Sequence, residues 1–175
     1  LKHKNIDFGG GLERIAAAAI NSFDVFETSM FKPLIQKLEE ISGKLYKENT
    51  NDMRIITDHL RGAYLLSAQG LVPSNRKQGY ALRRLIRRAI LRAQNLGIEQ
   101  DFLAQIIPLM EKNYTDLSDS ILDTRKEVLS VLTREEQAFR KTLKRGLKEL
   151  HKLKESGLTG KELFMLQDTY GFPLE

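Results

Sequence analysis

The sequence predicts a mostly α-helical fold, and two observations carry this prediction. Apolar residues recur three and four positions apart in one segment after another, which is the repeat of a helix with one buried face. Turn-forming residues, above all glycine and proline, then separate these segments. With 175 residues, 41% of them hydrophobic, the chain is long enough for one substantial core or for a core with a protruding helical arm.

The N-terminus predicts a strand, a glycine turn and a helix. Residues 1–8 are extended in character, three consecutive glycines occupy positions 9–11, and a helical pattern runs from Leu12 to about Asn21. This short strand and turn would precede the helical part of the molecule.

The next two helices are expected from periodicity and from their end signals. One should run from Phe31 to about Ser42, with Gly43 as its C-terminal cap. The other should be capped by Asn51 or Asp52 and should run to Gly70.

The segment from Asn75 to Arg92 predicts a helix with a basic face. It holds seven cationic residues, six of them arginines, and no acidic residue. On a helix, its cations and its apolar residues separate onto two halves of the cylinder, so one face should lie in the core while the arginines stand outward. The basic half comprises Arg83, Arg84, Arg87, Arg88 and Arg92, and the apolar half Leu82, Leu85, Ile86, Ala89, Ile90 and Ala93. The helix is expected to end near Gly97.

This basic face predicts an anionic partner. A guanidinium keeps its charge and grips phosphate oxygens with a planar fork. The net charge of +5 is concentrated in this helix, which favours nucleic acid over a membrane surface. The alternative is a solubilising face, although such faces usually mix both signs. The cations expected to contact nucleic acid are Arg76, Lys77, Arg83, Arg84, Arg87 and Arg88.

Three more helices are expected toward the C-terminus. A short helix should span about Asp101 to Asn113, and a last short one Gly160 to Gln167. Between them, Asp116 to Glu155 lacks proline and predicts one long helix, weakened by about 1 kcal/mol at Gly146. This helix could form a coiled-coil arm, but breaks in its heptads favour packing on its own domain.

Several kinds of site are excluded or not expected. The chain has no cysteine, which excludes disulfides and thiolate metal sites. Its three histidines lack metal-ligand spacing, so no metal is expected, and His59 should be a buried, hydrogen-bonded residue. The longest apolar run, residues 15–20, is too short to span a bilayer, and no signal peptide is evident, so we expect a cytoplasmic protein without membrane contact. Because the chain opens on Leu1, we expect a fragment of a longer protein.

Residues 7–14 place a carboxylate, a glycine turn and an arginine at the mouth of the first helix. Glycines permit close approach of the backbone to a ligand, and a helix N-terminus favours anions. No Lys-Ser or Lys-Thr pair follows the glycines, so the motif is not a P-loop. Taken alone, it fits either a phosphate site at Arg14 or a structural turn.

The run at residues 5–16, with Gly-Leu-Glu-Arg at its centre, resembles the third motif of class II aminoacyl-tRNA synthetases in its alanyl-tRNA synthetase form. Segments 54–61, 70–89 and 166–173 resemble that family in the same order and spacing, so the resemblance covers the chain from end to end. Phe8 stands where the family usually has threonine and Gly10 where it usually has methionine. Both departures lie beside the presumed substrate pocket.

The resemblance implies site residues and a domain division. Asp7 would bind the amino group of alanine, Gly9, Gly11 and Arg14 would contact ATP, and Asn75 with Asp168 would read a G·U wobble pair. A carboxylate such as Asp168 suits the exocyclic amino group of guanine, and an amide can donate or accept. Residues 1–20 would end the class II catalytic domain, and residues 21–175 would form the helical tRNA-recognition domain. Read without the resemblance, Asn75 is a turn residue and Asp168 a cap or turn carboxylate.

The resemblance therefore implies the tRNA-recognition segment of an alanine–tRNA ligase. The parent enzyme would use ATP and Mg²⁺ to aminoacylate tRNA(Ala), whereas this chain, lacking the first two class II motifs, should be inactive and hold no cofactor. Its expected partners are the tRNA(Ala) acceptor stem and the remainder of the synthetase, including any editing domain. Two alternatives are an autonomous ATP-dependent enzyme using Asp7 and Arg14, and a helical interaction module that self-associates through Leu132 and Phe139.

Overall fold

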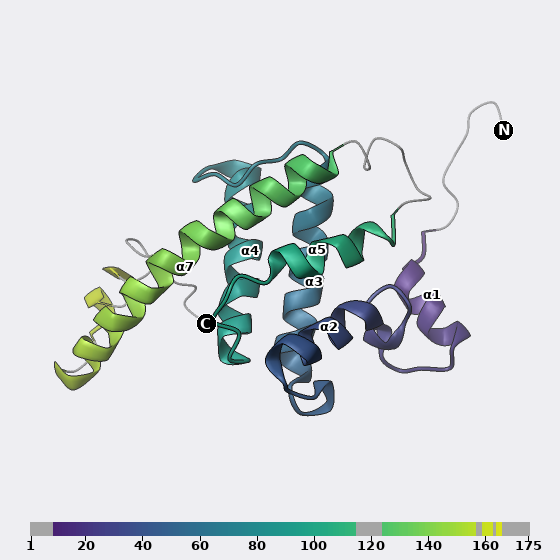
Figure 1. Ribbon diagram of the computed structural model, residues 1–175, viewed down its shortest axis with the longest axis horizontal. Helices are drawn as coiled ribbons and strands as arrows, with labels where there is room; N and C mark the ends of the chain where they lie inside the picture. Colours follow the sequence, from purple (N-terminus) through teal and green to yellow (C-terminus); the bar gives the residue numbers. More distant parts are fainter. Residues whose placement is uncertain (1–8, 115–123, 157–158, 163, 166–175) are drawn as a thin grey trace.

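The computed structural model describes residues 9–114, 124–156, 159–162 and 164–165. The predicted mostly helical class is confirmed, and no strand occurs within these described residues (Figure 1). The strand expected over residues 1–8 lies outside them. The elements are α1 (Leu12–Ala19), η1 (Val25–Glu27), α2 (Lys32–Ser42), η2 (Tyr46–Glu48), α3 (Thr50–Ala68), α4 (Lys77–Asn95), α5 (Leu103–Glu111) and α7 (Arg125–Ser156), where η denotes a 3-10 helix.

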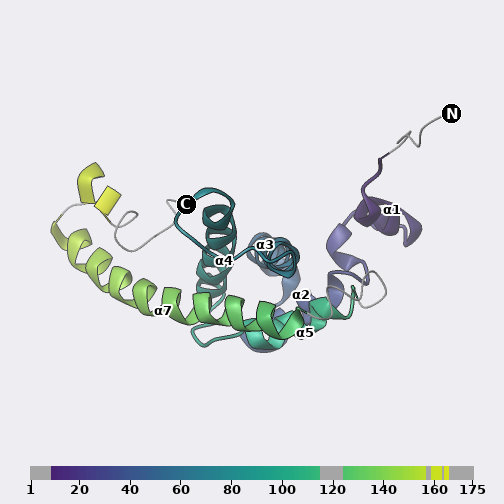
Figure 2. The same cartoon turned by 90° about the horizontal axis from the view of Figure 1, so that it is seen from above.

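A single core lies between α3, α4, α5, α2 and the first half of α7. α3 and α4 pack side by side, and α7 crosses both of them, as Figures 1 and 2 show. The apolar half predicted for α4 is the half that enters this core. The fully buried side chains include Leu60, Tyr64, Leu82, Ile86, Ile90, Leu132 and Phe139.

The ends of α2 and α3 show how well local signals predict boundaries. Gly43 adopts a left-handed φ of 68° and its N–H bonds the Glu39 carbonyl at 2.8 Å, which confirms the predicted cap. The expected cap at Asn51 or Asp52 is wrong, because η2 leads directly into α3 and Asn49 becomes the N-cap. Asp52 is instead ion-paired with Arg92 of α4 at 3.2 Å.

The long helix packs on its own domain, as the sequence favoured over a coiled-coil arm. Val128, Leu132, Phe139 and Leu143 are buried against α3, α4 and α5. Leu132 and Phe139 are therefore unavailable for the self-association that the interaction-module alternative required. The C-terminal end of α7 extends past the bundle (Figures 1 and 2). Of the last expected helix, residues 160–162 and 164–165 are described and are helical.

Candidate nucleic-acid interface

Two arginines of the predicted basic face reach a carboxylate of α7. Arg87 Nε lies 2.8 Å from Glu135 Oε1, and Arg83 Nε lies 3.3 Å from the same oxygen. The Arg87 guanidinium also lies over the Phe139 ring, 5.0 Å from its centroid. Both arginine side chains are only 22% exposed. The expectation that all five arginines stand outward is therefore wrong, because α7 covers the border between the apolar and basic halves of α4.

Arg88 and Arg92 are bound to α3 in the same way. Arg92 forms the ion pair with Asp52, and Arg88 Nη1 lies 3.1 Å from His59 Nε2. Arginine can only donate, so Nε2 accepts and the His59 proton sits on Nδ1, which lies 3.2 Å from Asp58 Oδ2. That hydrogen bond lowers the pKa of Asp58. His59 is hydrogen-bonded, as predicted, but it is of intermediate burial and not fully buried, since its side chain is 13% exposed.

The exposed cations of this helix gather at its N-terminal end. Arg76, Lys77 and Arg84 are exposed, and Lys77 and Arg84 are seven positions apart and hence on one face. Tyr80 lies between them and is 50% exposed. Tyr80 was not among the predicted site residues, although its spacing from Lys77 and Arg84 could have indicated it. We call Asn75, Arg76, Lys77, Tyr80 and Arg84 the α4 entry surface.

The loop before α4 is folded tightly onto the first turn of the helix. Ser74 N–H donates to the Gly79 carbonyl at 3.0 Å, and Gly79 is buried. A Cβ atom at Gly79 would lie 2.7 Å from the backbone oxygen of Val72, which is closer than a side chain tolerates. Glycine at position 79 is thus required for the loop to hold its course. The loop in turn carries Asn75.

The Asn75 side chain is exposed but is held in place from one side. Arg83 Nη1 donates to Asn75 Oδ1, and Arg83 Nη2 donates to the Pro73 carbonyl at 3.4 Å. Because a guanidinium only donates, the amide oxygen must face Arg83. No described residue accepts from Asn75 Nδ2. The amide NH₂ is thereby presented as a donor beside the exposed cations of the α4 entry surface.

The glycine motif at the N-terminus lies apart from this surface. Gly11 is the N-cap of α1, and its carbonyl accepts from Arg14 N and Ile15 N at 3.1 Å each. Gly9 and Arg14 are exposed, while Asp7 lies outside the described residues. α1 and α4 lie on opposite sides of α3 in Figures 1 and 2. The structure therefore does not bring Arg14 to Asn75.

An ion pair ties this motif to the helical body. Glu13 of α1 lies 2.5 Å from Arg61 Nη1 of α3, and Arg61 Nε donates to the Tyr114 hydroxyl at 2.6 Å. A hydrogen bond from its own backbone, followed by the Arg61 contact, lowers the pKa of Glu13. Arg61 thus links α1 to the segment that follows α5.

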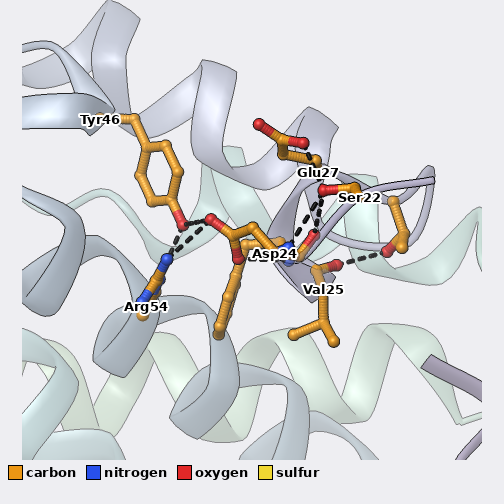
Figure 3. A network of polar contacts seen from close by, with 8 residues as sticks. Ser22, Asp24, Val25, Glu27, Tyr46 and Arg54 are labelled. Carbon is orange, nitrogen blue, oxygen red and sulfur yellow. Dashed lines mark hydrogen bonds and ion pairs between the residues drawn. The ribbon is translucent and has the colours of Figure 1, made fainter. Parts of the chain in front are cut away.

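A second polar network fixes the connection between α1 and α2 (Figure 3). Asp24 Oδ2 accepts from the Tyr46 hydroxyl at 2.6 Å and from Arg54 Nη2 at 2.7 Å, while Arg54 Nε donates to the Tyr46 hydroxyl at 2.8 Å. Burial acts to raise the pKa of Asp24, but the Tyr46 and Arg54 hydrogen bonds outweigh it and the pKa is lowered. Burial and the Asp24 contact raise the pKa of Tyr46 to about 12. Arg54 belongs to α3, so this one helix holds α1 through Arg61 and the connection after α1 through Arg54.

The described residues offer neither a metal site nor a membrane span. No cluster of three or more histidine, aspartate or glutamate side chains within them could hold a metal ion. No helix in the described part of the chain is long and apolar enough to cross a bilayer. Asp168, the second predicted wobble-pair reader, lies outside the described residues.

Comparisons with known proteins agree with the resemblance over the whole chain. The family model described as tRNA synthetases class II (A) matches residues 1–175. An alanine–tRNA ligase of Streptococcus mutans is 37% identical over 184 residues, and alanine–tRNA ligases of Ligilactobacillus salivarius and Lactiplantibacillus plantarum are each 41% identical over 186 residues. Each alignment covers 100% of this chain and 21% of the relative, so the chain spans about a fifth of the length of these relatives. The chain therefore belongs to the class II (A) family of tRNA synthetases, and the resemblance to alanyl-tRNA synthetases extends over its full length.

Proposed function

We propose that this chain is the tRNA-recognition segment of an alanine–tRNA ligase, and that it binds the acceptor stem of tRNA(Ala) and reads its G·U wobble pair. The complete cytoplasmic enzyme would join alanine to tRNA(Ala) with ATP and Mg²⁺. This segment alone would bind RNA without catalysis. The family match over residues 1–175 supports the proposal.

The observation that carries the wobble-reading role is the oriented amide of Asn75. Arg83 occupies Oδ1, so Nδ2 is the group left to meet a ligand, and it can only donate. In the wide minor groove of an RNA duplex a uracil carbonyl offers an acceptor to such a donor. Asp168, as a carboxylate, would accept from the guanine amino group. Arg83 acts in this proposal as a positioning residue for Asn75.

The remaining cations divide into two roles. Arg76, Lys77 and Arg84 are exposed beside Asn75, where contacts to phosphates would fix the register of the duplex. Arg87 and Arg88 support the surface from behind by holding α4 against α7 and α3.

Residues 1–20 would form the end of the catalytic domain and residues 21–175 the recognition domain. Leu12, Ile15 and Ile20 are 64%, 57% and 54% exposed, as expected of a helix face that the rest of a catalytic domain covers. In the complete enzyme, Asp7 would bind the alanine amino group, and Gly9, Gly11 and Arg14 would contact ATP. The Glu13–Arg61 ion pair would then hold the ATP-contacting end of α1 against the recognition domain.

The test is binding of this chain to an acceptor-stem hairpin with the G·U pair and to the same hairpin with G·C. We expect a preference for G·U of about 1–3 kcal/mol, lost in Asn75→Ala and in Asp168→Ala. Asn51→Ala, which changes an exposed asparagine of α3, is the matched control and should retain the preference. Equal binding of wild type to both hairpins would refute the wobble-reading role.

A further inference from the structure

A second basic run lies on the distal half of α7, away from the α4 entry surface. Residues 137–148 contain five cations and no acidic residue. The first of these, Arg140, belongs to the fold: it pairs with Glu136 at 3.1 Å and with Asp101 at 3.3 Å. The other four are exposed, and no described residue pairs with any of them. These four, Lys141, Lys144, Arg145 and Lys148, are here named the α7 stripe.

The α7 stripe is a continuous surface rather than a scatter of charges. Its members are spaced three, four and seven positions from Lys141, so they share one face of the helix. The same four residues line a hollow of about 250 Å³. Buried Leu143 holds the start of this segment in the core, and half-buried Leu147 packs against the core one turn later. The helix therefore presents these four cations from a fixed support.

Concentrating four like charges on one stripe is unfavourable in the free protein. Like charges four positions apart on a helix destabilise it by a few tenths of a kcal/mol per pair, and solubilising faces normally intersperse both signs. An anionic ligand would remove this repulsion.

The chemistry favours the phosphate backbone of RNA as that ligand. At 1.5 Å per residue the stripe extends about 10 Å along the helix, which is long enough to contact more than one phosphate of a duplex strand. Three of its four cations are lysines, which act as point charges and suit phosphate contacts that carry no sequence information. A membrane-surface helix would add an exposed apolar face. No large apolar side chain described on α7 is exposed.

We infer that the α7 stripe is a second RNA-contacting surface, which binds phosphates of the duplex without reading its bases. The choice of RNA as the anion rests on the proposed function. The role of the stripe does not depend on Asn75. It should therefore contribute equally to hairpins that carry G·U and G·C.

The test compares two triple variants that remove the same charge. Lys141→Gln/Lys144→Gln/Lys148→Gln alters the stripe, and Lys32→Gln/Lys47→Gln/Lys126→Gln alters three exposed lysines on α2, on η2 and at the start of α7. Binding of both hairpins to the 175-residue chain is measured across a salt series. Circular dichroism and urea unfolding establish that both variants are folded. Vesicles containing phosphatidylserine serve as a second anionic probe.

We expect the stripe variant to bind both hairpins about tenfold more weakly or worse at 0.1 M salt. The slope of log K against log salt should fall in magnitude by about 2 to 3, because each phosphate contact contributes about 0.7 to 0.9. The control should change the slope by less than half as much. Equal slopes for the two variants, no hairpin binding by the wild type, or an effect on vesicles alone would overturn the inference. If the stripe effect appears while no variant or wild type prefers G·U, the inference stands and the wobble-reading role fails.

Discussion

The basic runs of α4 and of distal α7 look alike in the sequence but differ in the structure. Each is a stretch of helix with several cations and no acidic residue. In α4, Arg83 and Arg87 share Glu135, and Arg92 pairs with Asp52. In distal α7, the four cations of the stripe are exposed, and no described residue neutralises them. The count of charges in a segment thus does not tell which cations are available to a ligand, because the neutralising carboxylates come from other helices.

The largest effect should come from Glu136 of α7, the buried carboxylate that pairs with Arg140. It is fully buried, accepts from Phe102 N at 3.0 Å and Leu103 N at 3.1 Å, and pairs with Arg140. Glu136→Ala would leave the N-terminus of α5 uncapped and Arg140 without its buried partner, so urea unfolding should show a loss of about 3–5 kcal/mol. Glu127→Ala, at an exposed position of the first turn, should lose less than about 1 kcal/mol. Similar losses in the two variants would contradict the structural role of Glu136.

A smaller effect is expected for Glu135, which neutralises two arginines of α4. Glu135→Gln keeps the shape of the side chain but removes its charge, so the free energy of unfolding should fall by about 1.5–3 kcal/mol. Hairpin binding at low salt should not weaken, because the variant has one negative charge fewer. Loss of RNA affinity in a folded Glu135→Gln protein would show that this carboxylate does more than hold α4.

The α4 entry surface can be disturbed without removing any cation. Gly79→Ala places a Cβ against the Val72 carbonyl, so the loop carrying Asn75 must shift, with a loss of about 1–3 kcal/mol in stability. We expect the preference for G·U to fall while the salt dependence of binding is unchanged. Ala81→Gly, an exposed position on the same helix, is the control for helix propensity and should keep the preference. If the Gly79→Ala protein kept its full preference for G·U, the position of Asn75 would not determine wobble reading.

Arg54 of α3 is a paired cation outside α4, and its partner is Asp24. The contribution of this pair to the free energy of unfolding should depend on pH. Asp24→Asn should lower the free energy of unfolding at pH 7 by about 1–2 kcal/mol. Because the pKa of Asp24 is lowered in the folded protein, its contribution is present above the ordinary value of 3.8 and is lost as pH falls through the folded pKa. The difference between wild type and variant should therefore shrink on acidification below pH 3.8.

The stability at alkaline pH gives an independent check on the network of Asp24, Tyr46 and Arg54. The pKa of Tyr46 is raised to about 12, so its contribution is complete below pH 10 and is lost as pH rises toward 12. Tyr46→Phe should remove this alkaline dependence, as measured by urea unfolding at a series of pH values. A difference between wild type and Tyr46→Phe that stays constant from pH 9 to pH 12 would contradict the network.

Local chemistry in the sequence predicted much of this fold, and long-range pairing limited the prediction. The Gly43 cap and the buried half of α4 follow from residues that are neighbours in sequence. The partner of Arg87 is 48 positions away, and no periodicity within α4 could indicate it. For the α7 stripe, the spacing of the four cations could be read from the sequence. Their exposure could not, because it depends on how α7 packs. The pairing of Asn75 with Arg83 likewise depended on the course of a loop that Gly79 permits.

The paired arginines of α4, such as Arg87, should hold the fold, whereas the lysines of the α7 stripe should bind RNA. One matched pair of single variants tests this division most directly. Arg87→Gln and Lys144→Gln each remove one charge from a helix. For each, the free energy of unfolding and the salt slope of hairpin binding are measured on the same protein. Arg87→Gln should lose about 1–2 kcal/mol of stability with little change in slope. Lys144→Gln should lower the magnitude of the slope by about 0.7 to 0.9 and change stability by less than about 0.5 kcal/mol. The reverse assignment, or equal changes in both variants, would contradict it.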